Sequence, residues 1–369
     1  MKDNDVQTVE TQAQAVFLTA IDPREPNIPS PKETADKKGF VSFGENNGYP
    51  NFLFDCYSEC SILQSIINGM VDYTCGSGFA DVIQQDKAIN KTGETYNELV
   101  KKCVADYMIF GAFAVQIIRN KLGDVLELYW IDARKVRLDE DEKYVYFRKE
   151  WTRYSRDMKK YDRWQRDVKF DNCIYYYKRP MSRGLYGLPM WSSVVKDVQT
   201  SIEISSFHLN GICNNFAASA FVNFNNGVPT KEVQKEIERK INEKFSGSRN
   251  AARMMLSFNN NKDQAVTLAR VPEDNFDKKY DALSKSVKEN IFVAFRAQPQ
   301  LFGTDPDRTA FNSVEYIESF KLFKKTVVAP IQKEIETAFA RIGEEYAFIL
   351  NEFQIELNPT ASNESPVSI

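Results

Sequence analysis

The chain has 369 residues, of which 43% are apolar, and its formal net charge is −3. A chain of this length can bury a sizeable core in two or three subdomains, and the apolar fraction excludes a protein that is disordered throughout. The slight negative charge argues against a protein that wraps nucleic acid in a basic surface, because such binding depends on many Lys and Arg contacts to phosphate.

The six cysteines lie mostly within apolar segments and include no CxxC pair. We therefore expect buried thiols in a reducing compartment, and neither disulfides nor a metal site. The N-terminal segment MKDNDVQTVETQAQAV lacks the apolar stretch that a signal peptide needs. No run of about 18 apolar residues occurs, so no membrane span is predicted. These features indicate a protein that works, or is assembled, in the cytoplasm.

Residues 1–40 are polar and include four closely spaced prolines, which predicts a flexible arm. Apolar residues with helical spacing then begin at Leu63, and Gly76 ends the run. A second helix is predicted from Tyr96 to about Phe113. Strand-like stretches follow at 114–119, 125–138, 143–151 and 172–178. The acidic run 139–142 falls between two of these stretches, where it predicts a turn.

Two long amphipathic helices are predicted after Gly187. The first begins at Pro189, which suits the first turn of a helix, and extends to about residue 218. Its apolar residues recur every three, four or seven positions, so about 28 residues would form a helix roughly 42 Å long. The second covers about 274–296. The expected packing residues of the two helices are Val195, Val198, Ile202, Leu209, Leu283 and Val287.

A compact insert, a loop and a third helix complete the pattern. The insert, about 219–273, combines strand-like segments at 220–224, 254–258 and 265–271 with a helix from Thr230 to Phe245. The sequence QPQLFGTDPDRTAFN follows the second long helix, and its prolines and glycine predict a loop. The third helix is predicted from Ser313 to about Gly343, bent or interrupted before Pro330. Residues 344–369 would form a short tail that is disordered from about residue 356.

The residues needed for common catalytic and cofactor chemistry are missing from the sequence. His208 is the only histidine, and its place in the middle of a predicted helix favours a polar structural position over a catalytic one. No GxSxG, P-loop or GxGxxG motif occurs, and Cys and His with zinc-ligand spacing are lacking. The acidic run 139–142 fits a solvated turn better than a cation site. We expect neither an enzyme nor a bound cofactor or metal ion.

The segment RKEWTRYSRDMKKYDRWQRDVKF, residues 148–170, mixes basic and aromatic residues. Such a mixture is found where proteins bind single-stranded nucleic acid, through charge and base stacking. It is also found in exposed hairpins with cross-strand aromatic pairs. We favour the hairpin or a protein–protein contact, and keep nucleic-acid binding as the alternative.

The order of several motifs resembles that of tailed-bacteriophage portal (connector) proteins. GLYGLP precedes the first long helix, NNFAASAFVNFNNGVP follows it, and KEVQKEIERKINEKFSG and SRNAARMMLSF form the insert. IFVAFRAQPQLFG then ends the second long helix, and FNSVEYIESFKLFKKTVVAPIQKEIE forms the third. Upstream, NNGYPNFLFDCYSECSILQSIINGMVDYTCGSGF is similar to the N-terminal wing segment of the family. The resemblance covers about residues 41–343 and lies in the ordered set, since no single motif is specific.

The resemblance implies an α+β portal-type fold that forms a ring oligomer. Residues 41–188 would be a mixed α/β wing, 189–218 and 274–296 the two stem helices, and 219–273 a small αβ clip. Residues 297–312 would be the tunnel loop, which lines the DNA channel, and 313–343 a kinked tunnel helix that belongs to the wing. In the family, an Asn followed by a Glu and an aromatic residue opens this helix, as Asn312, Glu315 and Tyr316 do here. The helical crown of larger members is reduced or absent.

The same resemblance implies partners and sites. Copies of the chain would form a ring, a dodecamer in virions, at one capsid vertex, together with the major capsid protein and assembled in the cytoplasm of a bacterial host. Double-stranded DNA would pass the tunnel-loop residues Gln298, Thr304, Asp305, Arg308, Thr309 and Asn312. The large terminase, and later the head-completion or adaptor proteins, would dock on the clip through Lys231, Lys235, Glu238 and Lys240. Another ring or scaffold component of a capsid is the structural alternative.

Overall fold

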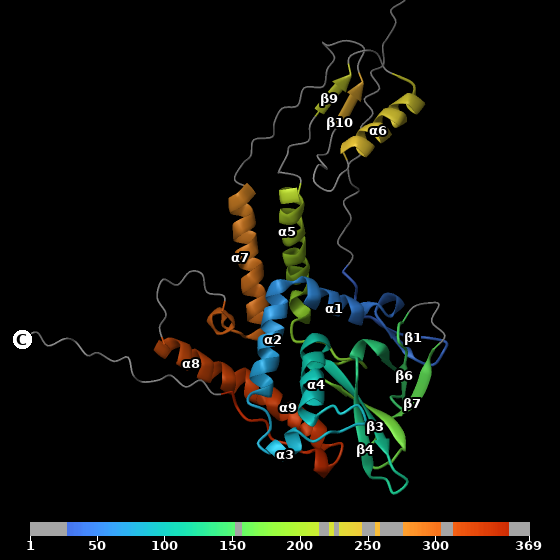
Figure 1. The fold of residues 1–369 in the computed structure, drawn as a ribbon, viewed down its shortest axis with the longest axis vertical. Coiled ribbons are helices and arrows are strands. Elements are labelled where there is room, and N and C mark those ends of the chain that lie inside the picture. The colour runs from blue at the N-terminus through green and yellow to red at the C-terminus, as the bar shows by residue number, and fades with distance from the viewer. Residues whose placement is uncertain are drawn as a thin grey trace, which may run out of the picture.

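The computed structural model describes residues 28–151, 157–213, 221–224, 229–245, 255–258, 276–303 and 313–353. An α/β body carries two long helices, α5 (Val195–Cys213) and α7 (Phe276–Phe295), which rise from it side by side (Figure 1). Beyond their far ends lies the insert, formed by β9 (Phe221–Phe224), α6 (Lys231–Phe245) and β10 (Met255–Phe258). None of the described helices is long and apolar enough to cross a membrane.

A six-stranded sheet forms one side of the body, in the order β4-β3-β8-β7-β6-β5. The strands are β3 (Ala112–Arg119), β4 (Val125–Ile131), β5 (Val136–Leu138), β6 (Tyr144–Phe147), β7 (Lys159–Arg163) and β8 (Asn172–Lys178). All neighbours are antiparallel except β7 and β8, which are parallel. The acidic run 139–142 forms the predicted turn between β5 and β6.

Four helices pack on the sheet or on each other: α1 (Tyr49–Glu59), α2 (Ser61–Cys75), the short α3 (Val82–Gln85) and α4 (Tyr96–Phe110). Thr95 caps α4, since its hydroxyl accepts from the Glu98 amide while the Glu98 carboxylate accepts from the Thr95 amide. This reciprocal arrangement satisfies amides that a helix start leaves unpaired. The five cysteines whose side chains are described are free and buried, as the sequence predicts.

The connection from α4 to β3 passes very close to the connection that leads into α5. Gly111 ends α4 with a φ of 72°, and a Cβ there would lie 2.3 Å from the carbonyl group of Leu188. Trp191 is fully buried, and its indole N–H donates to the Met108 carbonyl over 3.1 Å. Because these contacts hold 188–191 against the body, the helix starts later than predicted: a 3-10 turn, Ser192–Val194, precedes α5.

The N-terminal boundary predicted at residue 40 is wrong, because β1 (Glu33–Ala35) pairs with β2 (Val41–Phe43) on the body. The carboxylate of Glu33 accepts from the amides of Leu185 and Tyr186 over 3.0 and 3.1 Å. The Tyr186 ring in turn stacks on Phe43 at 4.5 Å. Hydrogen bonds and ring stacking therefore make residues 33–43 part of the folded body.

The third long helix is interrupted at the place that the sequence predicts. It consists of α8 (Ser313–Phe323), a π-helical segment (Lys324–Val328) and α9 (Ala329–Ala340). The Ala329 amide donates to the carbonyl of Lys324, five residues back. Pro330 follows directly and has no amide hydrogen to continue an ordinary helix. A widened turn before a proline accounts for the interruption.

The first residues of the predicted short tail, 344–369, pack on the body. Phe348 stacks on Phe79 with ring centroids 4.3 Å apart, and Leu350 forms a β-bridge with Phe79. Tyr346 and Leu350 are buried. Apolar contacts thus hold the chain in place through at least Leu350.

Part of the basic-aromatic segment 148–170 forms a strand of the sheet. Its middle forms β7, and Tyr161 and Trp164 pack against the core. Trp151 contacts the Phe40 ring edge-on at 4.8 Å and lies beneath the guanidinium of Arg137 at 4.9 Å. The described aromatic residues of the segment are therefore used in packing, which agrees with the structural interpretation.

We predict that Gly111→Ala lowers the free energy of unfolding by about 2–5 kcal/mol, because it combines a left-handed backbone with a clash against Leu188. Gly93→Ala is the matched control, since Gly93 has a similar φ of 80° but open space around it. It should cost only about 1–2 kcal/mol. Urea denaturation followed by tryptophan fluorescence measures both. Equal losses for the two variants would contradict the close contact between 111 and 188.

Candidate functional site at the base of the long helices

The parts of the predicted tunnel loop and tunnel helix that the structure describes lie close together at the base of α7. There α7 ends and a 3-10 helix (Pro299–Phe302, called η5) follows; both contact α2, and η5 also contacts α8. Phe292 and Phe295, in the last turns of α7, are buried. The chain therefore leaves the long helix from a fixed point in the core.

The end of α7 is closed by a residue in an uncommon backbone conformation. Arg296 has a φ of 51°, in the left-handed region that glycine usually occupies. The Ala297 amide donates to the Phe292 carbonyl over 3.0 Å, five residues back, which caps the helix. This cap turns the chain sharply from α7 into η5.

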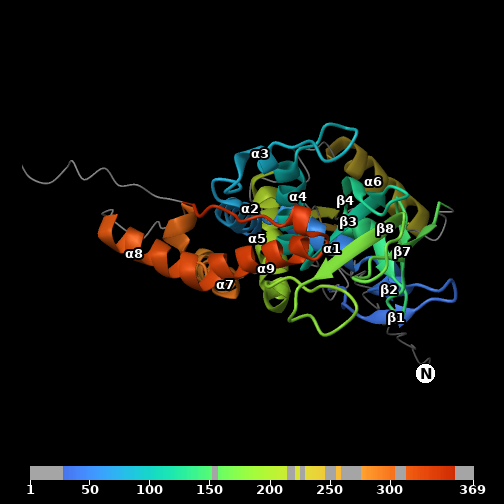
Figure 2. The ribbon, with the colours of Figure 1, turned by 90° about the horizontal axis from the view of Figure 1, so that it is seen from below.

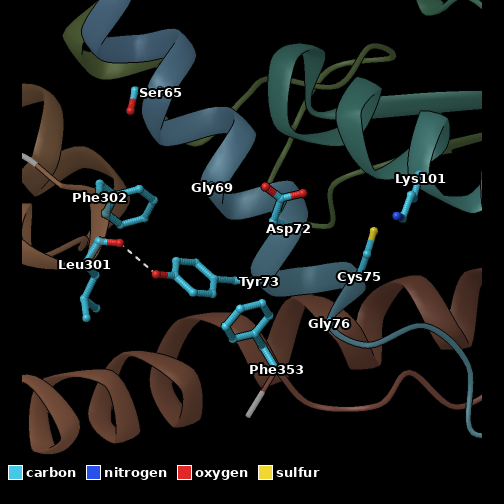
Figure 3. Close-up of a pocket in the computed structure, with 10 residues that line it drawn as sticks. All are labelled: Ser65, Gly69, Asp72, Tyr73, Cys75, Gly76, Lys101, Leu301, Phe302 and Phe353. Carbon is cyan, nitrogen blue, oxygen red and sulfur yellow. Dashed lines mark hydrogen bonds between the residues drawn. The ribbon is translucent and has the colours of Figure 1, made fainter. Parts of the chain in front are cut away.

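Tyr73 of α2 holds η5 in place (Figure 3). Its hydroxyl donates to the Leu301 carbonyl over 2.7 Å, and its ring meets the Phe302 ring edge-on at 5.7 Å. Burial raises the pKa of Tyr73 to about 12, so the hydroxyl remains a donor at neutral pH. One side chain thus provides both the polar and the aromatic contact to this segment.

Gly69, one turn before Tyr73 on α2, makes room for the Phe302 ring. A Cβ at this position would lie 2.6 Å from the ring, which is far closer than carbon atoms approach without a shift. Phe302 also contacts the rings of Phe292 and Phe323, at 6.1 and 5.9 Å. The ring therefore joins α2, α7 and α8 at one point.

A polar contact ties η5 to α8 as well. The side-chain amide of Gln300 donates to the Ser319 hydroxyl over 2.7 Å and to the Gln298 side-chain oxygen over 3.0 Å. Gly303 then closes η5. Gln298 is thus the only one of the expected channel residues within the described part of the chain. Thr304, Asp305, Arg308, Thr309 and Asn312 lie outside it.

A pocket of about 400 Å³ lies beside this junction and is drawn in Figure 3. Its polar side chains are Ser65, Asp72 and Lys101, and Phe302 and Phe353 form part of its apolar wall. In the described part of the chain, no three or more His, Cys, Asp or Glu side chains are grouped so that they could hold a metal ion. His208 lies exposed on α5.

The structure divides the six expected packing residues of the long helices into two groups. Val195, Val198 and Val287 are buried within the chain itself, and Ile202 packs partly buried against the same core. Leu209 and Leu283 are 62% and 44% exposed. The first group therefore packs within the chain itself. The two helices contact each other in this chain, and the Asn290 side chain donates to Asp197.

The insert residues are only partly described. Lys231 and Lys235 of α6 are exposed, whereas the side chains of Glu238 and Lys240 lie outside the described part. β9 and β10 form a parallel pair in register from Phe221–Met255 to Phe224–Phe258. The third strand expected at 265–271 also lies outside the described residues.

Residues 91–360 match the sequence profile of the family described as phage portal protein. This match covers well over half of the chain. The chain belongs to the phage portal protein family. That family is a structural component of particles, and no catalytic family is indicated.

Two solved structures have a fold similar to this portal protein. One is the neck of an empty gene transfer agent particle computed with C6 symmetry: 16% identity, 81% of this chain and 82% of that chain covered, and a TM-score of 0.53. The other is the neck of the native particle computed with C12 symmetry: 15% identity, coverage of 86% and 83%, and a TM-score of 0.51.

A third structure, an HK97-family phage portal protein from Corynebacterium diphtheriae, is 12% identical, with coverage of 79% and 90% and a TM-score of 0.44. No curated protein sequence matches the chain. At these identities the likeness concerns the fold.

We predict that Gly69→Ala destabilises the portal protein by about 1–2 kcal/mol, although alanine normally stabilises a helix interior relative to glycine. In a Phe302→Ala background the same change should stabilise the protein by up to about 1 kcal/mol, because the ring that the Cβ meets is gone. Thermal unfolding of the four proteins gives both values. The same sign in the two backgrounds would show that Phe302 does not pack on Gly69.

Proposed function

We propose that this portal protein forms a closed ring at one vertex of a capsid, through which double-stranded DNA is packaged and later ejected. The family match over residues 91–360 supports the portal role. The two similar folds were solved in particle necks computed with sixfold and twelvefold symmetry, which supports a dodecamer. The ring would belong to the virion and assemble in the cytoplasm of a bacterial host, beside the major capsid protein.

The observation that carries the ring proposal is the contrast along the two long helices. Their ends at the body are buried, but the far turns expose Phe207, Leu209 and Leu283 by 50%, 62% and 44%. Apolar side chains repeated along one projecting pair of helices favour contact with another protein surface. In a ring every copy presents the same surfaces, so neighbouring helix pairs can cover each other.

The tunnel-loop role rests on the position of η5. The structure holds Leu301 against Tyr73 of α2 and Gln300 against Ser319 of α8, so the chain before residue 304 has a fixed position on the body. Arg308 is the only Lys or Arg between Gln298 and Asn312, and Asp305 and Asp307 make the formal charge of this stretch −1. A loop of this charge would touch passing DNA without holding its phosphates tightly. We place Thr304, Thr309 and Asn312 on the same channel surface.

The insert is the part that we assign to partner docking. It lies beyond the far ends of α5 and α7, away from the body (Figure 1). Lys231 and Lys235 are exposed on α6, and Glu238 and Lys240 follow on the same helix. Such a charged helix suits polar, exchangeable contacts, as needed when the large terminase leaves and head-completion or adaptor proteins take its place.

Nucleic-acid binding by 148–170 is less well supported than the portal role. Tyr161 and Trp164 pack against the core and Trp151 packs on Phe40, so these rings are not free to stack on bases. Lys160 lies over the Tyr144 ring at 3.4 Å, which also uses the aromatic face within the chain. A different ring or scaffold component of a capsid would share the ring but not the DNA channel.

We predict that the purified chain forms rings with a central channel in negative-stain microscopy, and that Leu209→Asp with Leu283→Asp lowers the ring fraction at least about tenfold. Two charges on an apolar contact would have to be buried without partners. Leu126→Asp is the control, because Leu126 is similarly exposed, at 58%, on β4 of the sheet. Only monomers or dimers of the native sequence, in particles as well as in solution, would refute the proposed ring.

We also predict that deletion of Thr304–Thr309 leaves ring assembly intact but reduces the DNA that particles package or retain. The deleted residues carry the proposed channel contact, whereas the ring contacts lie elsewhere. Microscopy measures the ring, and nuclease-protected DNA per particle measures packaging. Normal packaging and retention by the deletion variant would reduce 304–312 to a simple connector.

A further inference from the structure

A second pocket, of about 190 Å³, lies where the end of α4, the end of α7 and α9 meet the chain that follows β8. Its apolar lining includes three methionines, and its polar lining includes two arginines and a glutamate: Met108, Met181, Met190, Arg179, Arg296 and Glu334. Met181, at the rim, is 78% exposed. Methionine side chains adapt their shape to an incoming group, so such a lining suits a partner's side chain.

The acidic and basic side chains in this pocket differ in whether they have a partner. The Tyr107 hydroxyl donates to the Glu334 carboxylate, so that glutamate already has a partner. Arg179 and Arg296 make no ion pair with any residue in the part of the chain that the structure describes. A guanidinium of this kind favours a carboxylate, which it can bind with two parallel hydrogen bonds. The pocket therefore suits an apolar side chain that has carboxylates beside it.

This portal protein itself displays such a group at α3. Ile83 is 87% exposed and Val82 is 62% exposed, the first being the highest value among its exposed apolar side chains. Asp81 precedes them directly and caps α3, since its carboxylate accepts from the amides of Ile83 and Gln84, and Asp86 follows at the other end of the helix. The Gln84 side chain donates to the carbonyls of Glu345 and Ala347, which fixes α3 to the chain after α9. The exposed apolar residues are thus held in place by contacts of α3 and have one aspartate at each end of this short helix.

Figure 2 shows where the elements that carry these two features lie in the body, and α3 is not among the elements that line the pocket. In this view along the long helices, α3 lies at the upper edge, and the chain that follows β8 lies at the lower edge. A protruding surface and a matching pocket on different elements of the body cannot meet within one chain. Between copies they give a head-to-tail contact, which is the kind of interface that closes a ring.

We propose that the pocket between α4, α7 and α9 receives Ile83 of the neighbouring copy, with its Asp81 and Asp86 facing Arg179 and Arg296. This inference rests on the proposed ring, and adds which surfaces meet within it. The apolar side chain enters among the methionines, while the two arginines gain carboxylates at the rim. A second contact, close to the body, then accompanies the one along the far turns of the long helices.

The test uses the full chain with two engineered cysteines, Ile83→Cys and Met181→Cys. In assembled rings, mild oxidation should join successive copies and give a ladder of covalent oligomers well beyond the dimer on a non-reducing gel. Each single variant should give no ladder. Leu122→Cys with Met181→Cys is the matched control, because Leu122 is 83% exposed but lies in the turn between β3 and β4.

A second variant tests the contact without forming a disulfide bond. Ile83→Asp should lower the ring fraction about tenfold, whereas Leu122→Asp should leave it unchanged. Rings that form normally with Ile83→Asp, and give no ladder with the cysteine pair, would overturn this contact and leave the proposed ring standing. Absence of rings from the native chain would instead contradict the proposed function itself. A ladder of covalent oligomers that forms with Ile83→Cys and Met181→Cys together, but with neither single variant nor the Leu122→Cys control pair, supports the contact.

Discussion

Burial of one end of each long helix in the α/β body is the contact on which the other parts depend. Val198 and Ile291 are fully buried there, and Phe295 completes the core at the end of α7. Each such side chain contributes about 1.5–3 kcal/mol when it leaves water. Because α5 and α7 share this core, the two helices have fixed positions on the body, and so has η5, which follows α7. Tyr73 and Phe302 extend the same core to α8. A packing defect near Phe302 would therefore be felt in several functional elements at once.

The two long helices differ along their length in whether their apolar side chains are buried or exposed to water. Near the body, apolar side chains stabilise the single chain, and farther out the same pattern leaves Leu209 and Leu283 exposed. Periodicity in the sequence describes a helix face and not what covers that face. That is why the six packing residues could be named from the sequence, whereas which of them are buried within the chain and which are exposed required the structure.

Other elements were predictable where local chemistry decides the outcome. Helix α4, strands β3 and β8, the helix of the insert and the interruption before Pro330 follow from periodicity, turn residues and the missing proline amide, whereas β1, β2 and the division of 125–138 into β4 and β5 were not predicted. Contacts between distant residues left no such signal. Glu33 is polar and lies in a proline-rich region, yet it binds amides about 150 residues away. Gly69 occurs in a helix, where glycine usually weakens the fold, and only the position of Phe302 explains it. A glycine within a strongly apolar helix was the available hint.

The π-helical segment gives the third helix an internal register boundary. It accommodates five residues with hydrogen bonds that reach one residue farther than in an α-helix. If that extra residue moved along the chain, α8 would turn by about 100° and advance by about 1.5 Å per step, while α9 stayed packed in the body. Residues at the start of α8 would then present a different face to whatever passes them. One continuous stretch of backbone would then join a helix that is fixed in the body, α9, to a helix whose register can change, α8.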